Sequence, residues 1–286
     1  VYAGANTRLD IAKSILDQNL SSGLQTLTGA VVNVHNCLVR DNALAGFLLR
    51  GGNVEVKNSI LEAAGTQARV FHWAGGGQVD SDYNNIRVAN GASVAGGDAR
   101  SSDRFLIDWQ TSTAFSNDVN SFGYEALFAN ESALDFHLKS RFGRFDPATG
   151  LFASNDTETS RLIDLGDPAS SYANEPTNNG NRINVGLYGN TAEASKSSGA
   201  PFLAPLTMSD GGTIRDVASL YWTYSGIAGS NYVNILFSGD GGTTWTNIGR
   251  EYVNAGSLQW HTTNVASTAQ GVWQVVLESD TNIFGQ

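Results

Sequence analysis

A stretch of eight residues that alternates apolar and polar side chains recurs in the first quarter of the chain. Its copies are Leu9–Leu16, Val32–Val39 and Val54–Leu61, with a looser one at Val79–Ile86. Equivalent positions in these copies are 23, 22 and 26 residues apart, at Ser14, Cys37, Ser59 and Asn85. Repeats of this length are typical of solenoids, in which each unit buries its apolar side only against its neighbours.

The pattern inside one repeat indicates strands. Val54 and Val56 alternate with polar residues, and a period of two belongs to a β-strand rather than to a pair of helices. A leucine-rich repeat would need a regular leucine pattern and an asparagine ladder, which the chain lacks. Gly51-Gly52 and Gly75-Gly76-Gly77 suit coil corners, where the backbone needs positive φ or a close approach. The repeat therefore predicts a parallel β-helix with coils of about 23 residues.

Composition supports an all-β, exported protein. Charged residues make up 15% of the chain, against about 25% in an ordinary soluble domain. The 32 glycines and many Ser, Thr and Asn residues favour short strands and tight turns. The net charge of -10 argues against nucleic acid as a partner. No apolar run approaches the roughly 20 residues of a membrane span, and a Lys-poor chain with one cysteine is typical of bacterial secreted proteins.

Two repeats and the region after them resemble a known family. Asn36–Val39 and Asn58–Leu61 look like coils of the pectate-lyase-like right-handed β-helix proteins. Four later segments resemble the closing region of secreted bacterial members of that family: Asp135–Ser140, Gly143–Gly150, Leu162–Pro168 and Gly180–Thr191. The likeness covers residues 8–197. It implies a right-handed parallel β-helix with a C-terminal cap and a cell-surface or extracellular location, but no particular reaction.

The remaining residues predict a second domain. A small, polar, Pro-bounded stretch at 191–205 is a candidate linker, so we place the β-helix at 1–197 and the second domain at 198–286. Strand signals about ten residues apart indicate an immunoglobulin-like sandwich. They lie at Ser219–Tyr224, Tyr232–Ser238, Thr243–Ile248, Ser257–Thr262 and Val272–Glu278. We expect the chain to be a fragment, with further coils before Val1 and a last sandwich strand missing or donated by another chain.

One hairpin in this domain fits the Asp-box pattern. In Ser238–Trp245, Asp240 is placed to accept backbone N–H groups across the turn. Gly242 suits positive φ, and Trp245 is expected to pack under the loop. The box occurs once, in a segment too short for a propeller, so we interpret these three residues as structural.

Lyase chemistry on a β-helix needs acidic side chains that hold calcium, together with a Lys or Arg base. Asp10 and Glu55 occupy matching positions two coils apart, with Asn33 between them. One Asn between two acids is a poor metal site, so solvated strand-face charges are the favoured interpretation. We expect no cofactor, although Asp-rich turns leave bound calcium open.

Other candidate residues divide into one binding triplet and a structural set. Phe71, His72 and Trp73 combine rings with an imidazole and are the candidate carbohydrate contact. Outward-facing His35 is expected to be inert. Cys37 shares its register with two serines and is interpreted as an interior structural residue, not a nucleophile. In the cap, the predicted contact is a buried ion pair that fixes the turn around Pro168, formed by Asp164, Asp167 and Arg182.

Three functions remain open. The favoured one is a non-catalytic extracellular or cell-surface scaffold, structural, adhesive or associated with glycan. The second is a fragment of a polysaccharide lyase or glycoside hydrolase whose active coils lie upstream, and the third is a carbohydrate-binding module. The expected partners are polysaccharide or other surface-protein subunits.

Overall fold

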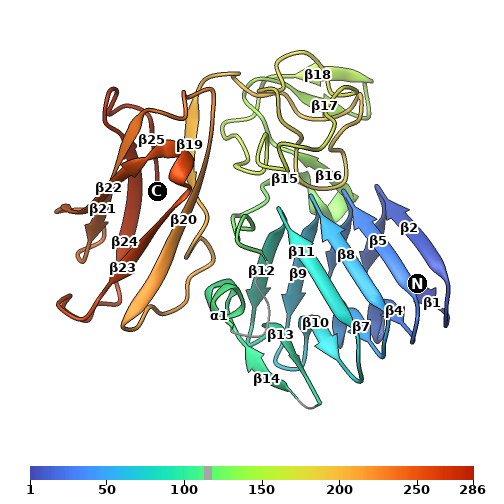
Figure 1. The fold of residues 1–286 in the computed structure, drawn as a ribbon. Coiled ribbons are helices and arrows are strands. Elements are labelled where there is room, and N and C mark those ends of the chain that lie inside the picture. The colour runs from blue at the N-terminus through green and yellow to red at the C-terminus, as the bar shows by residue number, and fades with distance from the viewer. Residues whose placement is uncertain (99, 113–117) are drawn as a thin grey trace. The chain divides into compact units, whose positions relative to one another are not determined.

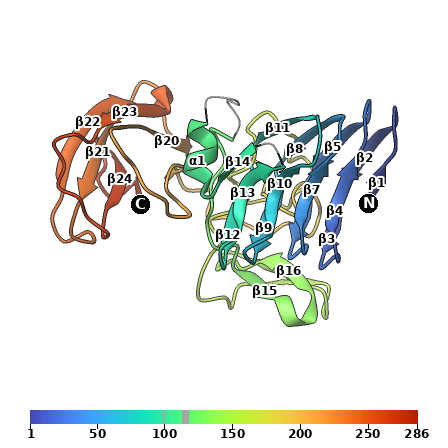
Figure 2. The same ribbon diagram turned by 90° about the horizontal axis from the view of Figure 1, so that it is seen from below.

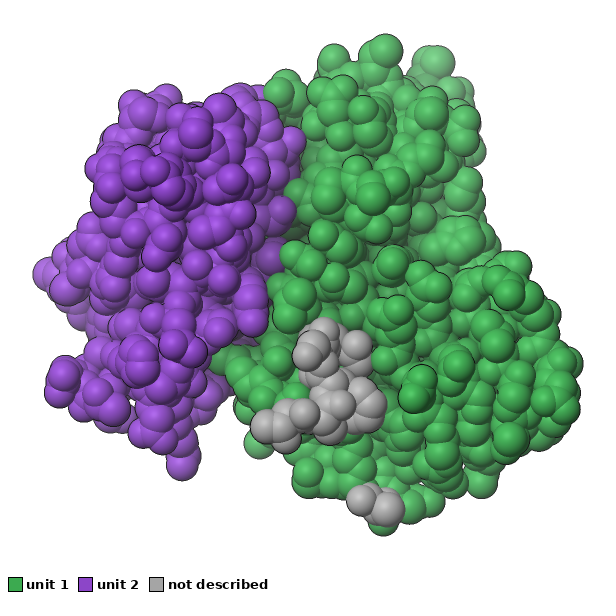
Figure 3. Space-filling model, in the orientation of Figure 1, with its two compact units in different colours: residues 1–199 green, residues 200–286 purple. Residues whose placement is uncertain are grey.

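The computed structural model describes residues 1–98, 100–112 and 118–286. The chain forms two compact units, Val1–Gly199 and Ala200–Gln286, coloured separately in Figure 3. The described residues are almost entirely strands, turns and loops. Their helical elements are one short α-helix and two 3-10 turns: α1 (Leu106–Thr111), η1 (Glu131–Ala133) and η2 (Val253–Ala255). The predicted all-β class is confirmed.

The first unit contains a β-solenoid of stacked parallel coils, as the repeat predicts (Figures 1 and 2). Sheet A has the order β1 (Tyr2–Ala3), β4 (Ser22–Thr26), β7 (Ala45–Leu49), β10 (Arg69–Trp73), β13 (Ser93–Gly97) and β14 (Arg100–Asp103). Sheet B consists of β11 (Gln78–Asp82), β8 (Asn53–Lys57), β5 (Val31–His35) and β2 (Arg8–Ala12). Sheet C consists of β12 (Asn85–Ala89), β9 (Ile60–Ala64), β6 (Leu38–Arg40) and β3 (Ile15–Asp17).

Apolar side chains of successive coils lie above one another and form the core. In sheet B the register aligns Leu9, Val32, Val54 and Val79. In sheet A the rings of Phe47 and Phe71 stack with centroids 5.4 Å apart. Each coil thus shields its neighbour, which explains why a sequence with short strands builds one continuous core.

The predicted column of small residues is confirmed for three coils and shifted in the fourth. Ser14, Cys37 and Ser59 follow one another in the sheet C register. The fourth member is Asn84 rather than Asn85, because Asn85 pairs with Ile60 and the Asn84 side chain accepts the Ser59 backbone N–H. The step is therefore 25 residues. The larger amide replaces the serine hydroxyl and reaches Val56 O on the neighbouring coil.

The chain after the last coil closes the solenoid end and continues as a closing segment, residues 128–199. β14 pairs with β13 antiparallel, and Phe122 bridges to Asn85. The closing segment holds two small antiparallel pairs: β15 (Phe128–Asn130) with β16 (Asp135–Leu138), and β17 (Arg144–Asp146) with β18 (Leu151–Ala153). Its remaining loops follow the corner between sheets B and C. Asn36 and Asn58, both at positive φ, bind them there.

The second unit consists of two antiparallel sheets around a shared core. One sheet has the order β19 (Phe202–Pro205), β20 (Val217–Ser225) and β23 (Ser257–His261). The other has the order β22 (Thr246–Tyr252), β21 (Tyr232–Ser238), β24 (Val272–Leu277) and β25 (Phe284–Gly285). This core contains three tryptophans: Trp222, Trp260 and Trp273.

Candidate functional site

The outward face of sheet B carries straight rows of polar side chains along the solenoid. The strand register aligns one side chain per coil in the first row: Asp10, Asn33, Glu55 and Asp80. The adjacent row follows the same register two residues further along each strand: Ala12, His35, Lys57 and Asp82. Because neighbouring strands in a sheet are about 4.8 Å apart, equivalent groups repeat at that spacing along the axis. The predicted match of Asp10, Asn33 and Glu55 is confirmed.

The closing segment forms a wall beside these rows. Asn58 fixes it by accepting the Asp167 backbone N–H at 2.7 Å and donating to the Ser170 hydroxyl at 3.0 Å. Between wall and sheet lies a groove of about 360 Å³. Most of its lining residues are polar: Asp10, Asn33, Val34, His35, Asn36, Glu55, Lys57, Asn58, Ser170, Ser171, Ile183 and Asn190. We call this hollow the sheet B groove.

Local pairs orient the charged groups of the sheet B groove. Asn33 donates to Asp10 at 2.6 Å, and Lys57 lies 3.3 Å from a Glu55 oxygen. Burial lowers the pKa of Lys57, but the hydrogen bond and charge of Glu55, with smaller effects from Asp167 and Asp80, raise it overall. The ammonium form of Lys57 is therefore favoured, and the amine is poorly suited to remove a proton from a substrate.

Sheet C presents the opposite electrostatic pattern. Its outward row alternates in sign from coil to coil: Asp17, Arg40, Glu62 and Arg87. Arg40 bonds to Asp41 at 2.9 Å and to Glu131 at 2.7 Å, and lies 3.7 Å from Asp17. Charges of this row compensate one another across the coils, whereas the first row of sheet B has three carboxylates and no cation. The charge of the sheet B row is offset in part from the adjacent row, where Lys57 lies 3.3 Å from a Glu55 oxygen.

The cap residues predicted to form an ion pair lie near one another. Asp164 and Arg182 are buried, and Asp167 turns the chain at Pro168 by accepting the Ala169 N–H. Arg182 donates to the carbonyl oxygens of Gly166 and Leu165. Burial lowers the pKa of Arg182 to about 10, against the raising effects of Tyr83, Asp164 and Asp167. Arg182 thus binds the turn through backbone carbonyls, and the carboxylates act on it through their charge.

The candidate carbohydrate triplet lies in sheet A and is turned away from solvent. Phe71 is fully buried, and Trp73 is 8% exposed and packs within the solenoid core. The buried His72 lies 3.4 Å from an Asp98 oxygen. Rings without an accessible face cannot stack on a sugar, so this burial argues against the triplet as a binding platform.

Cys37 is buried in the interior of the solenoid. Its sulfur lies 3.4 Å from His35 O, and its backbone N–H donates to the Ser59 hydroxyl. Burial raises the pKa of the thiol, against weaker lowering by backbone hydrogen bonds. A thiol that stays protonated and inaccessible is a poor nucleophile, in line with the structural interpretation.

The hairpin of the second unit has the contacts expected of an Asp-box. Asp240 Oδ1 accepts the backbone N–H groups of Thr243 and Thr244, and the Thr244 hydroxyl donates to Oδ2. These bonds and the Ser238 hydroxyl hold the pKa of Asp240 well below its usual range. Gly242 has φ of +90°, and a Cβ there would lie 3.5 Å from the Trp245 ring. Asp240 thus binds the turn, Gly242 adopts the positive φ that it needs, and the Trp245 ring lies beside Gly242.

Sequence reasoning missed the wall of the sheet B groove. Ser170, Ser171 and Asn190 lie more than 100 residues after the coils that they face, and their loops have no periodic pattern. The available signal was Asn36 and Asn58, which precede Cys37 and Ser59 in the repeat. Asn is common at positive φ, and its side chain is then free to bind a neighbouring segment.

Comparison with known proteins finds no matching family model, no similar curated protein and no similar solved structure. Within the described residues, no group of three or more His, Cys, Asp and Glu side chains is placed to hold a metal ion. Nor do the described helices include one that is long and apolar enough to cross a membrane.

Proposed function

We propose that this chain is a non-catalytic scaffold of the cell surface or extracellular space that associates with glycan through the sheet B groove. One observation carries the proposal: straight rows of polar side chains run along the stacked coils beside a fixed wall. A linear polymer needs an elongated site with repeating contacts. Carboxylate, amide and hydroxyl groups at coil spacing offer such contacts to sugar hydroxyls.

The state of the charged groups supports binding rather than turnover. Lys57 is paired with Glu55 and held as the ammonium, and Asp10 accepts a hydrogen bond from Asn33. Both carboxylates retain oxygen lone pairs that can accept from a ligand. Groups satisfied in this way orient a ligand without offering a free base.

Two finer assignments belong to the same proposal. We place the solenoid in the pectate-lyase-like right-handed β-helix superfamily, supported by the corner Asn residues and by coils of 22 to 25 residues. We also assign the second unit to the immunoglobulin-like sandwiches, supported by its two antiparallel sheets around a tryptophan-containing core. The surface location is supported by the low share of charged residues and by the resemblance of the closing region to secreted proteins.

Affinity electrophoresis in gels that contain a neutral or an anionic polysaccharide tests the proposal. Wild-type protein should be retarded by at least one of them, and Asn33→Arg should migrate freely because the long side chain fills the groove. Val31→Arg is the matched control, since Val31 lies on the same strand and is exposed but does not line the groove. Absence of retardation in every gel, or equal retardation of the two variants, would exclude the groove as a glycan site.

A second candidate, glycoside hydrolysis, is favoured by the strand register of two carboxyl groups. Glu55 and Asp80 are register partners on adjacent strands, and retaining glycosidases use two carboxyl groups about 5 to 5.5 Å apart. Release of reducing ends from a bound polysaccharide, lost in Glu55→Gln, would support this candidate over the scaffold. Formation of an unsaturated product, seen as new absorbance, would instead indicate a lyase.

A further inference from the structure

Glu175 lies at the centre of the closing segment and is 8% exposed. One of its oxygens accepts two backbone N–H groups, from Asn184 at 2.9 Å and Asn190 at 2.8 Å. The other oxygen is buried without a hydrogen-bond partner among the described residues. Asn190 lines the sheet B groove, so the carboxyl group of Glu175 holds part of the groove wall in place.

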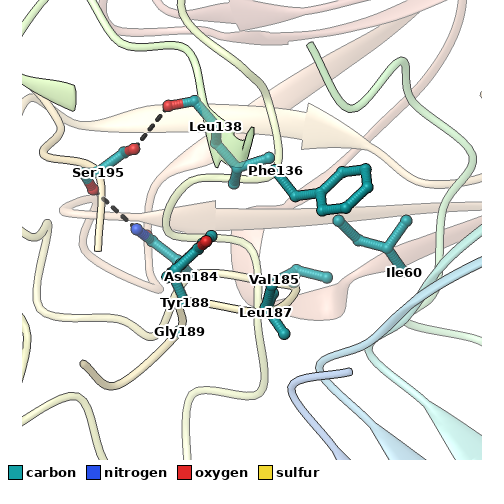
Figure 4. A pocket seen from close by; sticks show the side chains of 9 residues that line it. All are labelled: Ile60, Phe136, Leu138, Asn184, Val185, Leu187, Tyr188, Gly189 and Ser195. Atoms are coloured by element: carbon teal, nitrogen blue, oxygen red, sulfur yellow. Dashed lines mark hydrogen bonds between the residues drawn. The ribbon is translucent and has the colours of Figure 1, made fainter. Parts of the chain in front are cut away.

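Asp164 joins the same network from the opposite side and is 3% exposed. Its backbone N–H donates to the Asn184 side chain at 2.9 Å, and one carboxyl oxygen has no partner among the described residues. Asn184 therefore bonds to both acidic residues. Its side chain also donates to Ser195 O, and the Ser195 hydroxyl donates to Leu138 O, as Figure 4 shows.

Asn184 and Asn190 connect this network to the solenoid. The Asn184 carbonyl accepts a hydrogen bond from Asn36 at 3.2 Å, and the Asn190 carbonyl accepts one from Lys13 at 3.1 Å. Both donors project from coil corners. A change in the charge of Glu175, which accepts the Asn184 and Asn190 N–H groups, or of Asp164, whose backbone N–H binds Asn184, thus acts beside two of the bonds that fasten the closing segment to the coils.

The charged groups around the two acids offset only part of the effect of burial. Arg182 acts on Asp164 through its charge, and Arg182 is itself affected by Asp167 and by Tyr83 of the solenoid; Lys57 is affected by Asp167. Burial raises the pKa of Asp164 to about 7 and the charge of Glu175 adds to this, against the lowering effects of the Ser197 hydrogen bond and of the Arg182 charge. Burial also raises the pKa of Glu175 to about 7, against its backbone hydrogen bonds.

We propose that Glu175 and Asp164 form a proton-controlled latch, which fastens the closing segment to the solenoid and so sets the shape of the sheet B groove. Protonation removes two like charges from a loop that solvent cannot reach. The consequence for glycan binding rests on the proposed function, whereas the opening of the latch itself does not.

The direction of the pH dependence follows from the coupling between proton binding and closing of the segment. An acid that is harder to ionise in the closed state favours that state while it is protonated, and the gain is lost as the pH rises from the ordinary pKa through the closed-state pKa. The closing segment should therefore be held most firmly below about pH 4 and should loosen progressively as the pH rises to about 7. With a change of more than two pKa units for one group, the closing equilibrium falls more than tenfold between pH 5.5 and pH 8.

Amide hydrogen exchange of the whole chain tests the latch without any ligand. After correction for intrinsic rates, protection of the Asn184 and Asn190 amides should fall about tenfold or more from pH 5.5 to pH 8. The double variant Glu175→Gln, Asp164→Asn keeps the acceptor oxygens but cannot ionise, so its protection should change less than about twofold. Glu158→Gln is the matched control, because Glu158 is exposed in the same segment.

Protection that is constant or rises with pH in the wild type overturns the latch, as does an unchanged fall in the double variant. If that variant does not fold, carboxyl ¹³C shifts of the wild type decide, since the latch requires two carboxyl groups that titrate near pH 7. Gel retardation at pH 5.5 and pH 8 then separates the two proposals. A functional latch without retardation in any polysaccharide gel leaves the latch intact and removes glycan binding.

Discussion

At the residue scale, the column of Ser14, Cys37 and Ser59 inside the solenoid shows one hydrogen-bond geometry that serine and cysteine side chains share. The Ser14 and Ser59 hydroxyls donate to the carbonyl two residues earlier, and the Cys37 sulfur makes the same contact. We expect Cys37→Ser to change the free energy of unfolding by less than about 1 kcal/mol, since the hydroxyl fits the geometry of its neighbours. Urea denaturation measures this change.

The rate at which a thiol reagent labels Cys37 tests the interior position of this side chain. A thiol reagent should label native Cys37 no faster than global unfolding exposes it, because the side chain is fully buried and stays protonated. Fast labelling of the native protein would contradict its interior position. A loss of more than about 3 kcal/mol in Cys37→Ser would contradict the shared geometry.

At the element scale, the closing segment depends on the corner residue Asn58. Asn58→Ala removes the bonds to Asp167 and Ser170 and places a Cβ at φ of +52° without the help of an amide. We expect a loss of about 2 to 4 kcal/mol in stability. Asn58→Gly removes the same bonds but tolerates positive φ, so it should lose about 1 kcal/mol less. Equal stability of the two variants would exclude a backbone contribution; thermal denaturation provides the measurement.

A second prediction at this scale concerns Arg40 in the alternating row of sheet C. Arg40→Gln leaves Asp17 and Glu62 without their shared cation. Because the Arg40 side chain is only 14% exposed, we expect the free energy of unfolding to fall by about 2 kcal/mol. Burial raises the pKa of Glu62 to about 7 against the charge of Arg40. The loss should therefore be larger at pH 8 than at pH 5.5, where Glu62 takes up a proton.

The matched control lies on the same row. Arg87 pairs with Glu125 where both side chains are well exposed, so Arg87→Gln should cost less than about 1 kcal/mol. Chemical denaturation at both pH values measures the two variants side by side. Equal losses of unfolding free energy in Arg40→Gln and Arg87→Gln would show that burial does not strengthen the ion pairs of Arg40.

The strands of the solenoid could be predicted from the sequence, whereas the groove wall could not. The period of two and the coil-length repeat identify sheets B and C, because each strand is defined by contacts at a fixed spacing. The predicted register of the fourth coil was wrong by one residue, because Asn84 stands where the other coils have Ser or Cys and the repeat pattern is weaker there. The groove wall could not be predicted, because Ser170 and Asn190 are placed by contacts with distant corners and not by local periodicity.

At the scale of the whole molecule, buried acidic groups of the first unit and exposed acidic groups of the second respond to pH in opposite ways. In the first unit, burial raises the pKa of Asp118 to about 6 and that of Glu62, Asp164 and Glu175 to about 7. These groups are harder to ionise when folded, so they favour folding at low pH and the gain is lost between about pH 4 and pH 7.

The second unit has acidic groups of the other kind. Hydrogen bonds lower the pKa of Asp240, and the hydrogen bond and charge of Arg250 lower that of Glu278. Their contribution is present above the ordinary pKa of about 4 and disappears below it. Calorimetry of the whole chain should therefore show one transition that moves up between pH 7.5 and pH 5, and another that moves down only below about pH 4.

Assignment of the two transitions follows from Asn58→Ala, which should lower only the transition that rises on mild acidification. Each unit has its own core, which is what separate transitions require. If both transitions fall together on mild acidification, the buried carboxyl groups of the first unit must already be ionised and stabilised in the folded state. The two carboxyl oxygens that are buried without a hydrogen-bond partner among the described residues, Asp164 Oδ1 and Glu175 Oε2, would then need a different physical explanation.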